Sequence, residues 1–317
     1  MEFESLGRTG EKVPKIGLGT WKMGTYPEEE LKAIRKAVEV GMRLIDTAEM
    51  YANESLVGEA IRGYARDSFF LETKVSPSHL KRDDLIRACK GSLKRLGLKT
   101  IDLYMVHWPN PKVDIAETMA AMEYLADKGM IRHIGVSNFD AEELEAAVHA
   151  MKRHEIVSNQ VEYSILVRGI EGDGTMSYCR KNKITVIAYS PLARGAIFAA
   201  NQAALVKELQ KSAAGHGKTP AQVALNWIIA HKGVIAIPKA SQPSHVVENA
   251  GASGWRLSPG EIGRIDDSAV MVDALARRTK PAMGTVMPLV SLYTKMNEIK
   301  NRRIKRIIKR GNKRTGS

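Results

Sequence analysis

The run Phe69-Phe-Leu-Glu-Thr-Lys-Val75 decides the fold once two similar runs are placed beside it, Met42-Arg-Leu-Ile-Asp46 and Ile101-Asp-Leu-Tyr-Met-Val-His107. Each run is short, apolar and strand-like, and each is bounded by sequence with helical spacing. A polar residue stands at or near the end of every run, namely Asp46, Lys74 and His107. Strands that alternate with helices predict a parallel sheet, in which the ends of successive strands lie side by side.

The same alternation of strand-like and helix-like sequence occurs eight times along the chain. We expect strands at about 16–19, 43–46, 69–74, 101–106, 131–136, 156–161, 184–189 and 234–237. We expect helices at about 28–40, 54–63, 81–96, 115–128, 140–153, 173–182, 202–214 or 219–231, and 243–250. Eight strand–helix units predict a fold of the α/β class, a closed (β/α)₈ or TIM barrel.

A β-hairpin with its turn at Gly7-Arg-Thr-Gly10 is expected before the first barrel strand. The competing fold is an open doubly wound sheet, which would usually have Gly-x-Gly-x-x-Gly after its first strand. Here Gly17-Leu-Gly19 is followed by Lys22 where the third glycine should stand. We therefore expect one barrel domain over residues 1–280, followed by a C-terminal loop and basic tail over residues 281–317.

The composition is sufficient for a large core, since 44% of the 317 residues are hydrophobic. Cys89 and Cys179 lie in helix-like segments and form no Cys-x-x-Cys motif, which argues against disulfides and a structural zinc site. The N-terminus has neither the basic start nor the apolar stretch of a secretory signal, and no run of about 18 apolar residues follows. We expect a monomer in the cytoplasm.

The net charge of +13 is concentrated at the C-terminus, where residues 295–317 contain ten Lys or Arg and one acid, Glu298. Residues 1–294 carry only +4, an ordinary surface for an enzyme of small molecules. In the tail, apolar residues recur at roughly helical spacing: Met296, Ile299, Ile304, Ile307 and Ile308. Such a helix can bind an anionic membrane surface or a nucleic acid, although a solvated tail is the favoured interpretation.

Three motifs resemble catalytic or ligand-binding signatures but are incomplete. Gly217-Lys218-Thr219 looks like the end of a phosphate-binding loop, yet Ser212 stands where the first glycine is required, which favours a helix cap. The stretch Gly135-Val-Ser137 lacks the second glycine of a hydrolase nucleophile elbow. The eight histidines form no His-Glu-x-x-His motif and no i,i+4 pair, so no metal ligand set is visible.

Four polar residues should meet at the C-terminal face of such a barrel, which is where barrel enzymes carry their active sites. Asp46, Lys74 and His107 would end strands two, three and four, and Tyr51 lies five residues after Asp46. A phenol is a weak acid with a reference pKa of about 10, but a neighbouring ammonium stabilises the phenolate. Lys74 could supply that charge, Asp46 would orient Lys74, and neutral His107 could donate to a substrate carbonyl oxygen. The four residues therefore predict protonation of an oxygen while hydride reaches the carbon.

These motifs give the chain a family resemblance. Asp-Thr-Ala-Glu-Met-Tyr-Ala-Asn-Glu (46–54), Glu-Thr-Lys-Val (72–75) and Val-His-Trp-Pro (106–109) resemble the aldo-keto reductase family over residues 3 to about 270. Further matching motifs are Gly19-Thr20-Trp21, Gly135-Val-Ser-Asn-Phe139, Asn159-Gln-Val-Glu-Tyr163, Tyr189-Ser-Pro-Leu192 and Ile237-Pro-Lys239.

The resemblance implies an NAD(P)H-dependent reductase in which Tyr51 is the proton donor, tuned by Lys74 and Asp46, with His107 positioning the carbonyl. It implies that Ser137, Asn138 and Gln160 hold the nicotinamide amide, that Tyr189 stacks on the nicotinamide ring, and that Ser190 and Leu192 lie along the pyrophosphate. It implies further cofactor contacts at Gly19, Thr20, Asp46, Lys239, Ala240, Ser241, His245 and Asn249. Trp21 and Trp108 are the expected walls of the substrate pocket, beside Tyr51 and His107.

The sequence departs from the family pattern at the adenosine end. The family usually has Ser directly after the Lys and Arg six positions after it, whereas this chain has Ala240 and His245. A neutral imidazole cannot form a bidentate clamp on a 2′-phosphate. NADPH remains the expected cofactor through Lys239 and Ser241, with NADH as the alternative.

Each of the four central residues also has a structural interpretation when taken alone, since Asp46 could cap a helix and Lys74 could be a surface charge. Their order on successive strand ends favours catalysis. A non-catalytic, redox-sensing barrel subunit that binds cofactor is the alternative from another functional class, and the intact set of four residues argues against it.

Overall fold

The computed structural model describes residues 1–270, which begin with an antiparallel hairpin. Its strands are β1 (Phe3–Ser5) and β2 (Lys12–Pro14), with Phe3 opposite Pro14. Gly7 and Gly10 have φ values of +56° and +76°, a region that glycine enters without the steric cost of a Cβ. The predicted hairpin and its turn are therefore confirmed.

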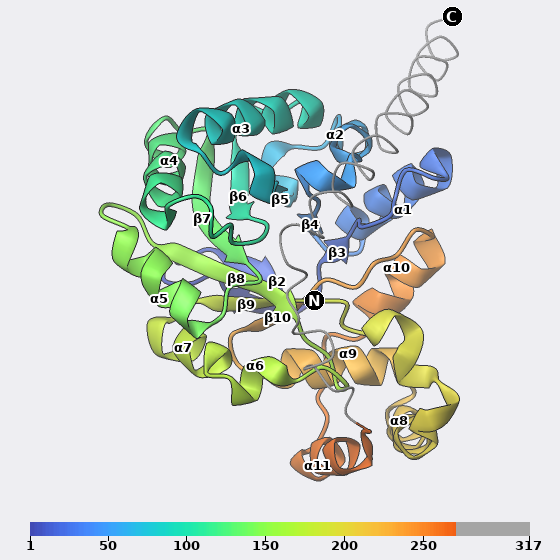
Figure 1. The fold of residues 1–317 in the computed structure, drawn as a ribbon. Helices are drawn as coiled ribbons and strands as arrows, with labels where there is room; N and C mark the ends of the chain where they lie inside the picture. Colours follow the sequence, from blue (N-terminus) through green and yellow to red (C-terminus); the bar gives the residue numbers. More distant parts are fainter. Residues whose placement is uncertain (271–317) are drawn as a thin grey trace, which may run out of the picture.

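Eight parallel strands follow, arranged in chain order at the centre of the molecule (Figure 1). They are β3 (Leu18–Gly19), β4 (Leu44–Asp46), β5 (Phe70–Val75), β6 (Ile101–Val106), β7 (Ile131–Ser137), β8 (Ile156–Glu162), β9 (Thr185–Tyr189) and β10 (Val234–Ala236). Parallel bridges pair Ile16 with Ala236 and Gly19 with Lys239, so the first and last strands meet. The predicted barrel is confirmed, and every predicted strand is present to within two residues at each end.

Helices surround the strands on the outside (Figure 1). They are α1 (Pro27–Glu39), α2 (Glu54–Ile61), α3 (Arg82–Leu96), α4 (Ile115–Asp127), α5 (Ala141–Ala150), α6 (Gly169–Gly172), α7 (Thr175–Asn182), α8 (Ala203–His216), α9 (Pro220–Ala230), α10 (Pro243–Ala250) and α11 (Pro259–Ser268). Short 3₁₀ helices are η1 (Glu49–Tyr51), η2 (Arg66–Ser68), η3 (Pro77–His79), η4 (Ala193–Phe198) and η5 (Ala200–Gln202). The two alternatives at 202–214 and 219–231 are both helices, α8 and α9.

The segment between α8 and α9 is a pair of helix caps, as expected from the incomplete phosphate-loop motif. Gly217 ends α8 in the left-handed conformation, with φ +61°. The Thr219 hydroxyl accepts from the Gln222 backbone N–H, and the Gln222 side chain accepts from the Thr219 N–H, which is a capping box. Lys218 therefore stands between two helix ends rather than after a strand.

The hydrophobic core has two parts, one between the strands and the helices and one inside the barrel. The inner part contains Leu44, Leu103 and Ile187, and the hairpin adds Leu6 and Val13 to it. The hairpin therefore contributes apolar side chains to the barrel interior. Cys89 and Cys179 are buried free thiols, both outside this inner part.

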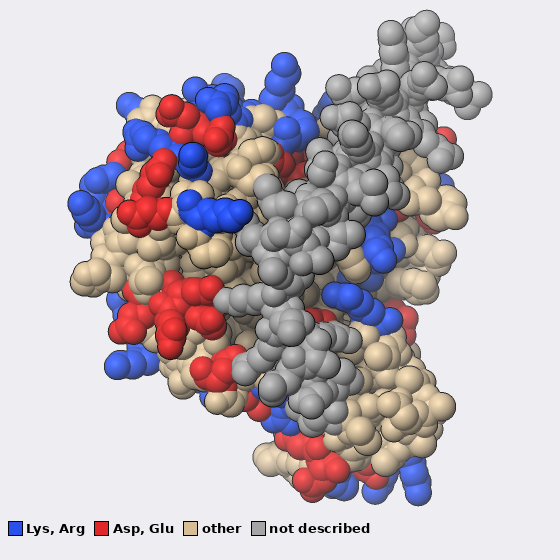
Figure 2. Space-filling model, in the orientation of Figure 1, with Lys and Arg blue, Asp and Glu red and all other residues tan. Residues whose placement is uncertain are grey.

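The surface of the described part carries acidic and basic side chains side by side on the face seen in Figure 2. No helix within residues 1–270 is long and apolar enough to cross a membrane. The predicted C-terminal loop and basic tail, residues 281–317, lie outside the described residues.

Candidate active site

The four residues singled out from the sequence come together at one end of the barrel. Asp46 is the last residue of β4, Lys74 lies one residue before the end of β5, and His107 directly follows β6. Tyr51 lies in η1, which follows β4. Asp46, Tyr51 and His107 line a cavity of about 510 Å³, a size typical of small-molecule sites.

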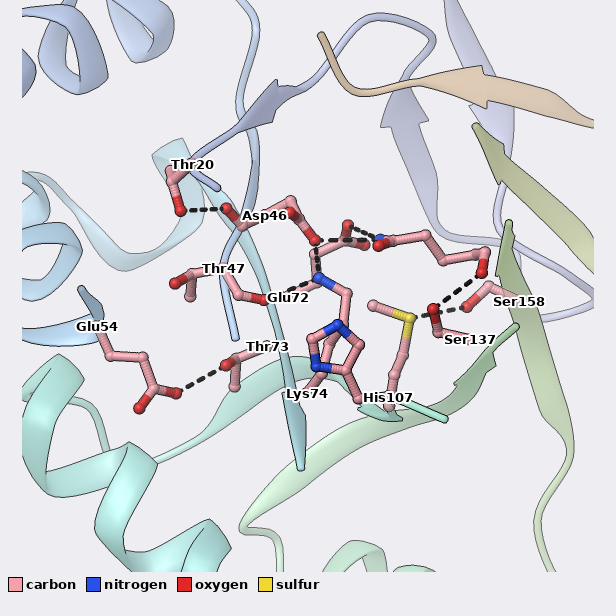
Figure 3. A network of polar contacts seen from close by, with 12 residues as sticks. Thr20, Asp46, Thr47, Glu54, Glu72, Thr73, Lys74, His107, Ser137 and Ser158 are labelled. Atoms are coloured by element: carbon pink, nitrogen blue, oxygen red, sulfur yellow. Dashed lines mark hydrogen bonds and ion pairs between the residues drawn. The ribbon is translucent and has the colours of Figure 1, made fainter. Parts of the chain in front are cut away.

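Lys74 is fully buried and forms an ion pair with Asp46 (Figure 3). Its ammonium also donates to the Thr47 carbonyl oxygen over 2.9 Å, and it lies 5.0 Å from the centre of the Tyr51 ring. A buried ammonium is tolerated only with such partners. The contacts therefore fix a positive charge beside the phenol ring.

His107 is the second neighbour of Tyr51, with their ring centres 5.6 Å apart in an edge-on arrangement. Burial lowers the pKa of His107 well below 6.5, and the charge of Lys74 acts in the same direction. The imidazole is therefore neutral at physiological pH. Its Nδ1 is buried and has no hydrogen-bond partner among the described residues. A neutral ring can donate one N–H, which suits a carbonyl oxygen beside Tyr51.

The loop that carries Tyr51 is held by Asn53, a fully buried residue that was not among the predicted site residues. The Asn53 amide donates to the Thr20 carbonyl oxygen over 2.7 Å and accepts from the Thr47 hydroxyl over 2.7 Å. These bonds join the loops after β3 and β4. Asn53 thereby fixes both ends of the segment in which Tyr51 lies.

The three residues expected to hold a nicotinamide amide lie together on the neighbouring strands β7 and β8, with Ser137 at the end of β7, Asn138 directly after it and Gln160 near the end of β8. The Ser137 hydroxyl donates to the Gln160 carbonyl oxygen over 2.9 Å, and the Asn138 amide donates to the His107 carbonyl oxygen over 3.0 Å. The Tyr189 hydroxyl donates to Asn138 Oδ1 over 2.9 Å. These polar side chains and the Tyr189 ring thus line one wall of the cavity.

Backbone conformations that are rare for residues other than glycine gather around this cavity. Lys22, Asn138, Ser190 and Arg194 all line it and have φ values of 63°, 63°, 49° and 57°. Such conformations cost free energy and are concentrated at functional sites. Their presence here is support, independent of the motifs, for a functional role of this cavity.

Not every expected cofactor or substrate residue borders the cavity. Gly19, Trp21, Trp108, Ser190, Leu192 and Lys239 line it, whereas Thr20, Ala240, Ser241, His245 and Asn249 do not. The Thr20 side chain is fully buried and donates to the Asp46 carbonyl oxygen (Figure 3). The Lys239 ammonium donates to the Ser241 hydroxyl over 3.0 Å, which links a residue of the cavity to one outside it.

Two basic residues at the cavity, Lys22 and Arg194, were not among the predicted site residues. Arg194 lies 5.2 Å from the centre of the Trp21 ring, and the ammonium of Lys22 lies 4.5 Å from it. Lys22 lies in a turn and Arg194 in the short η4, where its backbone is left-handed, so no hydrophobic pattern indicates where either side chain points. A favourable cation–π contact therefore joins the loop after β9 to the loop after β3.

Glu72 was also given no role, although it lies two residues before Lys74 on the same strand. It is fully buried, and its Oε1 accepts from Gln160 Nε2 over 2.9 Å. The same nitrogen donates to Asp46 Oδ1 over 3.0 Å. The available signal was its spacing, since Glu72 lies two residues from Lys74 and so on the same face of β5. Within residues 1–270, no cluster of His, Cys, Asp or Glu could hold a metal ion.

Comparison with known proteins gives consistent results. A family model described as the Aldo/keto reductase family matches residues 15–269. The methylglyoxal reductase YeaE of Escherichia coli (strain K12) is 40% identical over 262 residues, which cover 80% of this chain and 90% of the relative.

Two solved structures extend the comparison to the fold. A thermostable aldo-keto reductase in complex with the inhibitor epalrestat matches with a TM-score of 0.80 and 40% identity, covering 85% of this chain and all of that one. An aldo/keto reductase from Klebsiella pneumoniae, in complex with NADP and acetate, matches with a TM-score of 0.77 and 38% identity, covering 85% of this chain and 96% of that one.

Proposed function

The chain belongs to the aldo/keto reductase family, and we propose that it reduces an aldehyde or a ketone to the alcohol with NADPH. The proposal rests on the buried Lys74–Asp46 ion pair beside the Tyr51 ring, with neutral His107 edge-on to the same ring. A site of this kind places a proton donor and a neutral hydrogen-bond donor where one carbonyl oxygen can contact both.

The residues present fit a nicotinamide cofactor. The cavity offers hydroxyl and amide groups from Ser137, Asn138 and Gln160, and the aromatic face of Tyr189 beside them. An amide needs paired donors and acceptors, and an aromatic face holds a planar ring. The relative from Klebsiella pneumoniae was solved with NADP, which supports the same cofactor here. When bound, NADPH would supply the hydride for the carbonyl carbon.

The protein itself supplies the proton and the orientation. Tyr51 donates its phenolic proton to the oxygen as the alcohol forms, and the Lys74 ammonium stabilises the phenolate that remains. Asp46 holds Lys74 in place by their ion pair. His107 donates to the same substrate oxygen and so fixes the carbonyl, while Trp21 and Trp108 form apolar walls of the cavity.

The residues expected beside the adenosine of the cofactor determine the choice between NADPH and NADH. Lys239 and Ser241, which are hydrogen-bonded to one another, offer a charge and a hydroxyl to a 2′-phosphate. Ala240 and the exposed His245 add little to such a grip. NADPH use with appreciable NADH use is therefore proposed, with Asn249 as a further contact. Because one relative is a methylglyoxal reductase, small 2-oxoaldehydes are the first substrates to assay.

The first test of the proposal is Tyr51→Phe, assayed by NADPH oxidation with methylglyoxal and a panel of other small aldehydes. Loss of the phenolic proton should lower kcat by about a hundredfold or more, the usual contribution of general acid catalysis. Tyr26→Phe is the matched control, because the Tyr26 side chain is 72% exposed and lies outside the cavity. Comparable turnover in a folded Tyr51→Phe variant would contradict the assignment of Tyr51 as the acid.

The alternative of a non-catalytic, redox-sensing subunit predicts NADPH binding without turnover across that panel. The intact Asp46, Tyr51, Lys74 and His107 arrangement supports catalysis instead. The monomeric state, the cytoplasmic location and the domain division at residue 280 stay predictions. So does an additional role of residues 295–317 on an anionic membrane surface or nucleic acid, which would appear as salt-dependent binding lost on truncation.

A further inference from the structure

Glu72 is a second carboxyl beside the Lys74–Asp46 pair, and the proposed proton transfer does not use it. β4 and β5 are paired so that Asp46 and Glu72 are direct neighbours in register. Glu72 and Lys74 are two residues apart on β5, so their side chains point to the same face of the strand. Figure 3 shows Asp46, Glu72 and Lys74 gathered at one point.

The hydrogen bonds around Glu72 account for only one of its two oxygens. Its Oε1 accepts from Gln160, whose nitrogen also donates to Asp46. Its Oε2 is buried, and no hydrogen-bond donor within residues 1–270 reaches it. Lys74 donates to Asp46 and to the Thr47 carbonyl oxygen rather than to Glu72. Within the described part of the chain, Glu72 therefore has no cation in direct contact.

Charge balance decides the state of this cluster. Asp46 on β4 and Lys74 on β5 are the charged groups that act on Glu72, and Gln160 is the polar group that reaches it from β8. With both carboxyls ionised, the cluster would have a net charge of −1 in the barrel interior. An uncompensated buried charge is very costly, whereas one proton on the pair makes the cluster neutral.

We propose that Glu72 is a positioning residue of the reduction site: it is protonated, it donates its O–H to Asp46, and it holds the Gln160 amide with its other oxygen. One proton is then shared by two adjacent carboxyls. Asp46 remains a carboxylate with one negative charge, and it accepts hydrogen bonds from both Lys74 and Glu72. Lys74 consequently keeps more of its positive field for Tyr51 than it would beside two carboxylates. The catalytic consequence rests on the proposed function, whereas the protonation of Glu72 does not.

The effect of burial on the pKa of Glu72 agrees with this geometry. Burial raises the pKa of the Glu72 carboxyl well above its usual range, and the negative charge of Asp46 adds to the effect. The charge of Lys74 acts in the opposite direction, and so does the bond from Gln160. A bond between the two carboxyls requires a proton on one of them.

The first experiment is infrared spectroscopy of the full-length protein at neutral pH, without substrate. The spectrum of the wild type minus that of Glu72→Gln should contain the C=O band of a protonated carboxylic acid. Glu54→Gln is the matched control, because Glu54 is also fully buried but forms an ion pair with Arg95. That variant should lose a carboxylate band only. A wild type without the protonated band, or with that band unchanged in Glu72→Gln, overturns the proposal.

The second experiment compares kinetics in the two Glu72 variants. Glu72→Leu removes both hydrogen bonds, so kcat should fall by about tenfold or more, as expected for an unsatisfied buried partner. Glu72→Gln keeps a donor and an acceptor and should restore the larger part of that loss, with a pH profile of kcat that follows the wild type. A shift of that profile by about one pH unit would instead indicate an ionised Glu72.

The two proposals fail in different ways. Should Tyr51→Phe retain full turnover, the proposed function fails, while the infrared result still decides the protonation of Glu72. Should Glu72→Leu fail to fold, the infrared band and the pH profile of Glu72→Gln still decide the inference.

Discussion

The imidazole of His107 is the titrating group of the site with the clearest consequence for pH dependence. It is 8% exposed, and burial lowers its pKa well below 6.5, the ordinary value from which the unfolded chain titrates. At a pH between the lowered native pKa and 6.5, His107 is protonated in the unfolded chain but neutral in the native protein. Stability contributed by neutral His107 is therefore fully present above pH 6.5 and is lost as pH falls below it.

We predict that the free energy of unfolding of the wild type falls more steeply with decreasing pH than that of His107→Gln. The difference should approach at most about 1.4 kcal/mol for each pH unit below 6.5. Denaturant titrations between pH 7.5 and 5.5 measure it. His149→Gln is the matched control, since His149 is exposed on α5 and should leave the slope nearly unchanged. Parallel slopes for wild type and His107→Gln would show that the pKa of His107 is the same in the native and unfolded states, and would contradict the lowered pKa.

Some residues of the site can be identified from the sequence, whereas others cannot. Asp46, Lys74 and His107 could be found because each is polar and stands at the end of an apolar run, which in a barrel places it on one face. Glu72 and Lys74 share a strand face by their spacing, so the sequence also contained the signal for Glu72. Asn53 could not be found, because a short polar loop has no periodicity and its partners are distant in sequence.

At the scale of elements, Asn53 joins the loop after β3 to the loop that contains η1. It is fully buried, and its amide satisfies the Thr20 carbonyl oxygen and the Thr47 hydroxyl. Removing the amide leaves both groups buried without these bonds. Because Tyr51 lies between Thr47 and Asn53, the same change loosens the segment that carries the proposed acid.

We predict that Asn53→Ala lowers the free energy of unfolding by roughly 1–3 kcal/mol, the cost of leaving buried polar groups unsatisfied. It should also lower kcat, since the Tyr51 hydroxyl is less well placed. Denaturant unfolding and NADPH oxidation measure the two effects. Asn201→Ala, at an exposed position in η5, should change stability by no more than about 0.5 kcal/mol. Equal stability of the two variants would rule out the anchoring role of Asn53.

The elements that escaped prediction were those with weak patterns. α6 has four residues, too few to show a helical period. α11 contains two glycines and buries only Ile265, so its apolar face is narrow. Its start nevertheless had a capping signal, because the Ser258 hydroxyl accepts from the Glu261 N–H and Glu261 bonds back to Ser258. Long helices with a full apolar face were predicted to within a few residues.

At the scale of the whole molecule, the barrel depends on the seam where its first strand meets its last. The alternation of strands and helices in the sequence predicts the number of strand–helix units. Closure of the barrel depends instead on contacts between residues more than 200 positions apart. Gly19 N donates to the Pro238 carbonyl oxygen over 3.1 Å, and Ala236 N donates to the Lys15 carbonyl oxygen over 2.9 Å. The seam therefore requires the two backbones to approach closely.

Gly19 permits that approach, because a Cβ at this position would lie 2.7 Å from the Ile237 carbonyl oxygen. We predict that Gly19→Ala lowers the free energy of unfolding by about 1–3 kcal/mol, the usual cost of overpacking against a rigid neighbour. Gly263→Ala is the control, since this α11 glycine has no atom within 4 Å of the added Cβ and should gain up to about 1 kcal/mol from helix propensity. Denaturant unfolding measures the free energy of unfolding of both variants. If Gly19→Ala is as stable as the wild type, the strands can separate at the seam without cost, and the barrel is held together by its helices rather than by closure of the sheet.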